Sequence, residues 1–136
     1  MNKIVKWLLE ADEPWTHYRV LVDLLDLPED DPEVQSAYVR MLSHPKVNDL
    51  ITQAATWPGY AIKRHNDAGH PIYKISTLAD FGIKTNHPEL LALIEAILAH
   101  QAPEGAFQNL INIPVAYGGR GEDEWAWILC DAPTLL

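Results

Sequence analysis

The residues best suited to chemistry stand together in one short stretch. Arg64, His65, Asp67 and His70 bring a guanidinium, two imidazoles and a carboxylate close together in the chain. Such a set could bind a divalent metal at an open site, or form an acid–base pair with Arg64 holding an anion. The spacing matches no recognised metal pattern. We therefore favour a structural role, with Asp67 in an Asx-type turn and His70 capping a helix that begins at Pro71.

Asp131 is the second candidate, because it lies in an apolar segment where an unpaired carboxylate is costly. We expect it to pair with a cation such as Arg64 or His65. The alternatives are a functional acid with a raised pKa and a solvent-facing side chain. The adjacent Cys130, the single cysteine of the chain, is expected to be a small buried hydrophobe.

Two further motifs have simpler explanations than ligand binding. The acidic run 29–31 precedes Pro32, but no third aspartate follows one turn later to complete a magnesium site. We predict instead that Asp31 is the N-cap of a helix with Pro32 at its first position. The glycine-rich stretch 118–121 lacks the Lys-Ser/Thr pair and the preceding strand of a phosphate loop, so we predict a flexible turn.

Composition limits the classes of partner. The 136 residues fit one domain, and their formal net charge of −9 would repel a nucleic-acid backbone or an anionic membrane. No apolar run is long enough to span a membrane. A single cysteine excludes an intrachain disulfide and suits a reducing compartment, so the predicted location is the cytoplasm. We predict no cofactor and no bound metal.

The elements that must position these residues read as helices. Apolar spacing and proline starts predict helices over residues 4–9, 15–27, 32–43, 45–55, 71–82 and 88–101, and a last helix from Trp125. The helix over 88–101 is the most regular, with Asn86 as N-cap. Its predicted inward face is Leu90, Leu91, Ile94, Ile97, Leu98 and Gln101. No segment indicates a strand; residues 111–117 could be extended, but Pro114 argues against a central strand.

The helices form a repeat. Residues 18–27 match residues 72–81 at an offset of 54, and each stretch is followed by a Pro-Glu-apolar helix start. One more step lands on Trp125, so the last helix would open a third unit without its partner. The chain ends on apolar Thr134-Leu135-Leu136. We therefore expect a domain that is incomplete at its C-terminus, or one covered there by a second copy as a homodimer.

One motif carries a resemblance. Gln101, Gly105 and Phe107 resemble the Gln-Gly-Trp repeat of squalene and oxidosqualene cyclases, with Phe in the Trp place. The helix-pair period is similar to the α/α-toroid domains of these cyclases and of protein prenyltransferases. The stretches 64–71 and 125–133 resemble prenyltransferase-like repeat proteins of undefined role. The resemblance implies a structural role for Gln101 and Phe107, which would bond and stack on a neighbouring helix end, and a central cavity.

The chain departs from these enzymes where their chemistry lies. The cyclase acid motif Asp-x-Asp-Asp is absent. The prenyltransferase zinc set needs Asp, Cys and His suitably spaced, but Cys130 is directly followed by Asp131, and neighbours in a helix do not face one another. Neither activity is therefore expected.

These observations predict an all-α domain over residues 1–136, made of antiparallel helix-pair repeats that form part of an α/α toroid. Its predicted function is a binding or interaction module for an apolar or small ligand or a second chain. The alternative is a lyase, cyclase or transferase that uses His65, Asp67 and Asp131. The predicted ligand-binding residues are Arg64, His65, Asp67, His70, Trp125 and Trp127.

Overall fold

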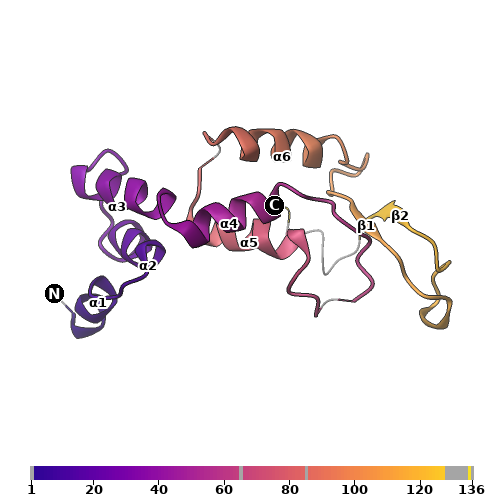
Figure 1. Cartoon of the computed structure of the whole chain (residues 1–136), viewed down its shortest axis with the longest axis horizontal. Coiled ribbons are helices and arrows are strands. Elements are labelled where there is room, and N and C mark those ends of the chain that lie inside the picture. The colour runs from indigo at the N-terminus through magenta and orange to yellow at the C-terminus, as the bar shows by residue number, and fades with distance from the viewer. Residues whose placement is uncertain (1, 65, 85, 128–134, 136) are drawn as a thin grey trace. The chain divides into compact units, whose positions relative to one another are not determined.

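Figure 1 shows the computed structural model, which describes residues 2–64, 66–84, 86–127 and 135. These residues are mostly helical and include one small two-stranded sheet, so the all-α prediction is right for most of them. The chain divides into two compact units, Met1–Asp49 with Leu78–Ile83, and Leu50–Thr77 with Lys84–Leu136. Across the described residues, every helix is too short or too polar to span a bilayer.

Local sequence explains where the helices of the first unit begin. Their bounds are α1 Lys3–Leu9, α2 Pro14–Arg19, α3 Pro32–Leu42 and α4 Pro45–Ala54, the last of which continues into the second unit. Asn2 caps α1 by accepting the N–H of Ile4 at 2.9 Å. Asp31 caps α3 by accepting the N–H of Glu33 at 2.8 Å, as predicted. Proline opens α2, α3 and α4, because the first helical N–H needs no partner within the helix.

The predicted helix over residues 15–27 is interrupted. After α2 the chain continues as a π-helical turn, Val20–Leu24, in which the N–H of Leu25 donates to the carbonyl of Val20 at 3.0 Å. Asp26 then adopts a left-handed conformation with φ of 52°. Aspartate tolerates this conformation better than most residues because its short side chain can bond locally.

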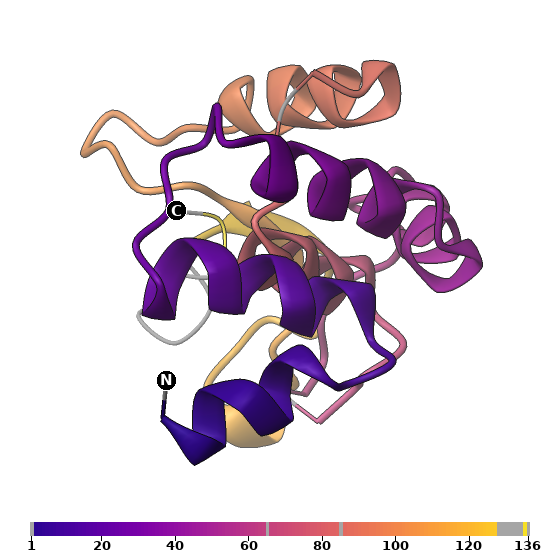
Figure 2. The ribbon, with the colours of Figure 1, turned by 90° about the vertical axis from the view of Figure 1, so that its left-hand side faces the viewer.

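Aromatic side chains join the helices of the first unit. Tyr18 of α2 packs against Tyr38 of α3 with ring centroids 5.3 Å apart, and both rings are buried. Trp15 stacks on Phe81, which lies at the end of α5, with ring centroids 4.7 Å apart and planes 1° from parallel. Figure 2 shows the indigo-to-purple helices α1, α2 and α3 side by side, as their contacts require.

Gly82 ends α5, Pro71–Phe81, with a Schellman motif. The N–H of Ile83 donates to the carbonyl of Leu78 at 3.1 Å, and the N–H of Gly82 donates to Ala79 at 2.9 Å. Gly82 has φ of 76°, and a Cβ placed there would lie 3.1 Å from Cε1 of the buried Tyr18 ring. Both the backbone conformation and the space therefore require glycine here.

The second unit combines helices with a short sheet. Besides the first turns of α5 it contains α6 Pro88–Leu98, strand β1 Asn109–Ile111, a 3-10 turn Val115–Tyr117 and strand β2 Glu124–Ala126. The strands are antiparallel and pair Leu110 with Trp125 at their centre. Ile62, Ile72 and Ile111 form a buried cluster. The partly buried side chains packed against this cluster are Tyr73, Ile113, Ala126 and Leu135.

The predicted helix beginning at Trp125 is wrong where the structure describes it, because residues 124–126 form β2 and Trp127 is not helical. Aromatic and β-branched residues favour strands, and Trp125 and Trp127 alternate with smaller neighbours as they would along a strand. The prediction that the chain contains no strand is also wrong, because β1 and β2 pair with one another. Acidic residues at 122–124 were compatible with a helix start, but pairing with β1 overrides this local signal.

The predicted face of the helix over 88–101 is only partly right. The buried residues of α6 are Leu90, Leu93 and Ile97, whereas Leu91 and Leu98 are about half exposed. His87, rather than Asn86, occupies the N-cap position and makes no side-chain cap bond. This helix is apolar on nearly every side, so spacing alone does not select the face that packs.

The Gln101 motif closes on itself. The Gln101 side chain donates from Nε2 to the carbonyl of Gly105 at 2.8 Å, and Gln101 forms an antiparallel bridge with Phe107. Ala102 and Ala106 are joined by a further backbone bond of 2.8 Å. The described bond of Gln101 therefore stabilises its own loop, whereas the cyclase resemblance implies a bond to a neighbouring helix end.

The apolar C-terminal end is partly accounted for within the chain. Leu135 is half-buried and packs against the cluster of Ile62, Ile72 and Ile111. Thr134 and Leu136 lie outside the described residues. The predicted dimer contact through this end stays a prediction. Leu135 adds little to an exposed apolar surface there, because it packs within the second unit.

We expect Gly82→Ala to lower the free energy of unfolding by about 2 kcal/mol, because it combines a left-handed backbone with a crowded Cβ. Gly105→Ala is the matched control, since Gly105 has φ of 94° and nothing lies within 4 Å of its Cβ position. The control should cost about 1 kcal/mol, the backbone term alone. Urea unfolding of both variants measures the difference, and equal losses would show that the Tyr18 contact is unimportant.

Candidate functional site

The candidate site is built on the segment that connects α4 to α5. In this segment the N–H of Ile62 donates to Leu110, and its carbonyl accepts from the N–H of Asn112, both at 2.9 Å. Ile62 is also buried, at 6% exposure. A buried residue with both backbone groups bonded is held firmly. Ile62 therefore fixes the backbone position from which the exposed residues Lys63 and Arg64 follow.

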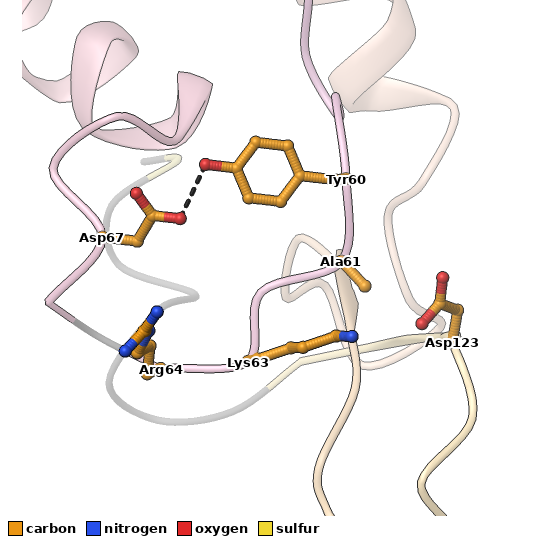
Figure 3. Close-up of a pocket in the computed structure, with 6 residues that line it drawn as sticks. All are labelled: Tyr60, Ala61, Lys63, Arg64, Asp67 and Asp123. Carbon is orange, nitrogen blue, oxygen red and sulfur yellow. Dashed lines mark hydrogen bonds between the residues drawn. The ribbon is translucent and has the colours of Figure 1, made fainter.

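Tyr60 and Asp67 form a short hydrogen bond at the site. The Tyr60 hydroxyl donates to Oδ2 of Asp67 at 2.6 Å (Figure 3). The N–H of Gly69 donates to Oδ1 at 3.1 Å, which confirms the predicted Asx-type turn. The Tyr60 bond is the main reason that the pKa of Asp67 lies below its ordinary value. The same bond raises the pKa of the Tyr60 phenol, since it favours the protonated hydroxyl.

His70 serves the fold with both ring nitrogens. It is 2% exposed, and its Nε2 lies 2.8 Å from the carbonyl oxygen of Tyr60. Because a carbonyl can only accept, Nε2 carries the proton and Nδ1 is an acceptor. Nδ1 accepts the N–H of Ile72 at 3.2 Å, which confirms the predicted cap of α5. No ring nitrogen of His70 remains free for a ligand or a metal.

The charged side chains gather around an open recess of about 320 Å³ in the second unit (Figure 3). Its lining residues are Tyr60, Ala61, Lys63, Arg64, Asp67 and Asp123. Asp123 lies just before β2, and its Oδ1 accepts from Nδ2 of Asn112 at 2.8 Å. In Figure 3 the Lys63 side chain extends toward Asp123. Arg64 lies close enough to Asp67 to help lower the pKa of its carboxyl group.

The cations and carboxylates of the recess differ in their partners. Asp67 and Asp123 each accept hydrogen bonds from neutral donors. Lys63 and Arg64 are exposed, and neither makes an ion pair or side-chain hydrogen bond with another described residue. Among the described residues, the bonding capacity left unused is that of N–H donors. The recess can therefore bind an acceptor, and above all an anionic one.

The described part of the recess does not suit proton transfer. Asp67 is held in its ionised form and already accepts two hydrogen bonds, so it is a poor proton donor near neutral pH. Within the described ranges, no three His, Cys, Asp or Glu side chains gather as metal ligands do. His65 and Asp131, the other residues of the predicted enzyme site, lie outside the described residues, as does Cys130.

Trp125 and Trp127 do not line the recess. The Trp125 ring stacks on His100 with centroids 3.4 Å apart, and lies 5.6 Å from the ring of Trp57. The indole N–H of Trp57 in turn points to Oδ1 of the buried Asn109 at 3.4 Å. Trp125 is thus a packing residue of the second unit, and Trp127 is exposed.

Three polar lining residues, Tyr60, Lys63 and Asp123, are absent from the sequence prediction. Lys63 could have been predicted from the sequence, since two adjacent cations, Lys63 and Arg64, are unusual in an acidic chain. Tyr60 had none beyond its aromatic, hydrogen-bonding side chain. Asp123 is far away in the sequence and reaches the recess only because β2 pairs with β1, which in turn pairs with Ile62. Such a contact leaves no local pattern to read.

Tyr60→Phe should raise the titration midpoint of the Asp67 carboxyl toward the ordinary value of 3.8, because the strongest bond to the carboxylate is lost. In the unchanged chain this lowered pKa adds stability above pH 3.8, and the contribution disappears as the pH falls through the folded-state pKa. Carbon NMR of the carboxyl group measures the midpoint. Tyr117→Phe, at an 83% exposed tyrosine, is the control, and the same midpoint in both variants would refute the assignment.

His70→Ala should destabilise the chain by about 2–4 kcal/mol, because it opens a cavity and leaves the Tyr60 carbonyl and the Ile72 N–H unpaired. Arg64→Ala should change stability by less than about 0.5 kcal/mol, as expected for an exposed side chain. Urea unfolding followed by circular dichroism compares the two variants. A small loss for His70→Ala would mean that its ring nitrogens are not needed by the fold.

Comparisons with protein-family models, with curated proteins and with solved structures found no match to this chain. The α/α-toroid resemblance therefore has the sequence motifs as its support.

Proposed function

We propose that the chain is a ligand-binding module whose recess at Lys63 and Arg64 takes a small ligand with an anionic group, such as a phosphate. The supporting observation is the imbalance of partners. Both carboxylates of the recess accept hydrogen bonds from neutral donors, whereas the two cations make no such bond with any described residue. An anionic group would use the N–H groups left over.

The chemistry of the lining favours a polar ligand over an apolar one. Of the six lining residues, four are charged, and Ala61 is the only aliphatic side chain among them. Arg64 offers a planar fork that matches the oxygens of a phosphate or carboxylate, and Lys63 adds a mobile point charge. The net charge of −9 repels anions at long range, so binding would depend on these short-range contacts and would weaken with added salt.

We further infer that the scaffold is a helical repeat related to α/α toroids. The support is the repeated helix start, because α3 follows the π-helical turn Val20–Leu24, and α6 follows α5, after similar lengths of chain. An enzyme of the alternative class would need His65 and Asp131 to join Asp67, and Asp67 itself is engaged as an acceptor.

Titration with inorganic phosphate, followed by amide NMR of the full chain, tests the ligand site. We expect saturable shifts at the amides of Ala61, Lys63 and Asp123. Changing Lys63 and Arg64 together to Gln should raise the Kd about tenfold or more, as expected when charge-assisted hydrogen bonds are lost.

The matched control changes Lys3 and Lys6 to Gln, which removes the same charge from α1 in the first unit. Its Kd should stay within about twofold of the unchanged chain, since neither lysine lines the recess and exposed charges contribute little. Equal weakening in both double variants would mean that phosphate responds to overall charge, and the proposal would fail.

A further inference from the structure

The first unit has a polar recess of its own. It has a volume of about 260 Å³ and is lined by the chain between α1 and α2, by the last turn of α3 and by the start of α4. Its polar lining residues are Asp12, His17, Arg40 and His44. Its apolar wall is formed by Leu9, Ala11 and Pro14.

Among the described residues, one ring nitrogen of His17 has no hydrogen-bond partner. Its Nδ1 lies 3.2 Å from the carbonyl oxygen of Leu9, at the end of α1. Since the carbonyl can only accept, Nδ1 carries a proton in this contact. In the neutral ring Nε2 is then an acceptor, and no described residue donates to it.

His44 has the opposite arrangement. Its Nδ1 accepts the N–H of Lys46 at 3.2 Å, which caps the start of α4. Its Nε2 must therefore carry the proton and act as a donor. The ring of Trp15 stands edge to face against it, with centroids 5.4 Å apart and planes at 88°, which restrains the orientation of the imidazole.

Arg40 and Asp12 complete the set. Arg40 is exposed in the last turn of α3 and forms no ion pair with another described residue. Asp12 is exposed and offers carboxylate oxygens. The recess thus presents donors on Arg40 and His44, acceptors on His17 and Asp12, and an apolar wall. A metal does not suit it, because Nε2 of His44 is already protonated.

We propose that this recess binds a small organic acid that carries a hydroxyl group next to the carboxylate. The carboxylate would accept from Arg40 and from Nε2 of His44, the hydroxyl would donate to Nε2 of His17 or to Asp12, and the carbon chain would lie on Leu9 and its neighbours. A volume of about 260 Å³ corresponds to roughly nine waters at about 30 Å³ each, which suits a ligand of this size.

The probe is α-hydroxyisocaproate, titrated into the full chain and followed by amide NMR. Isocaproate is the matched ligand without the hydroxyl group. The matched ligand without the carboxylate is 4-methylpentane-1,2-diol, which keeps the α-hydroxyl group and the same carbon chain. We expect saturable shifts at the amides of Ala11, His17 and His44 with α-hydroxyisocaproate. Binding of either matched ligand should be about tenfold weaker, since one set of hydrogen bonds is missing. Equal binding of isocaproate, or shifts confined to other residues, would overturn the proposal.

Two variants locate the bonds on the protein. Arg40→Gln removes the cation, and His44→Asn keeps an acceptor for the N–H of Lys46 while it removes the Nε2 donor. Each should raise the Kd about tenfold. Arg40→Gln should change the thermal midpoint little, whereas His44→Asn also loses the ring contact with Trp15 and should lower it slightly while the chain stays folded. Arg120→Gln, at a cation in the second unit, is the control and should leave the Kd within about twofold. Equal weakening by Arg120→Gln would overturn the proposal.

Discussion

The backbone pairing of Ile62 with the segment 110–112 is the contact on which the second unit depends. Ile62 exchanges two hydrogen bonds of 2.9 Å with this segment while its side chain is buried against Ile72 and Ile111. The pairing holds the α4–α5 connection against the sheet, so that Lys63 and Asp123 border the same recess. It also fixes the backbone on either side, including the carbonyl of Tyr60 that receives Nε2 of His70. Loss of this contact would remove the wall of the recess as well as part of the core.

The hydrogen-bond partners of the polar side chains show which groups stabilise the fold and which can bind a ligand. His70, His44 and His17 each give one ring nitrogen to a backbone partner. In His70 the second nitrogen is also bonded, because the residue is buried and an unpaired nitrogen would be costly. His17 and His44 both border the recess of the first unit, and no described residue bonds to the second ring nitrogen of either. Asp67 and Arg64 differ in the same way: the Asp67 carboxylate accepts two hydrogen bonds, whereas Arg64 makes none with a described residue.

Sequence reasoning succeeded where the decisive interaction lies within about one helical turn. The cap at Asp31, the Asx turn at Asp67 and the cap by His70 each join residues two positions apart. It failed at Trp125, where acidic neighbours suggested a helix but pairing with β1 imposed a strand. It also failed on the face of α6, since a helix with apolar residues all round offers no preferred side until its neighbours are in place.

By itself the sequence determined a largely helical chain, the places where its helices begin, and the local turns that carry its charged residues. Those features follow from proline geometry, capping side chains and the 3.6-residue period, which act over a few residues. Tertiary structure alone decided that Asp123 joins Lys63 and Arg64, that Trp125 packs on His100, and that His17 and His44 border one recess. These contacts depend on burial and on pairing between distant segments, and their entropy cost is repaid only when the whole unit folds.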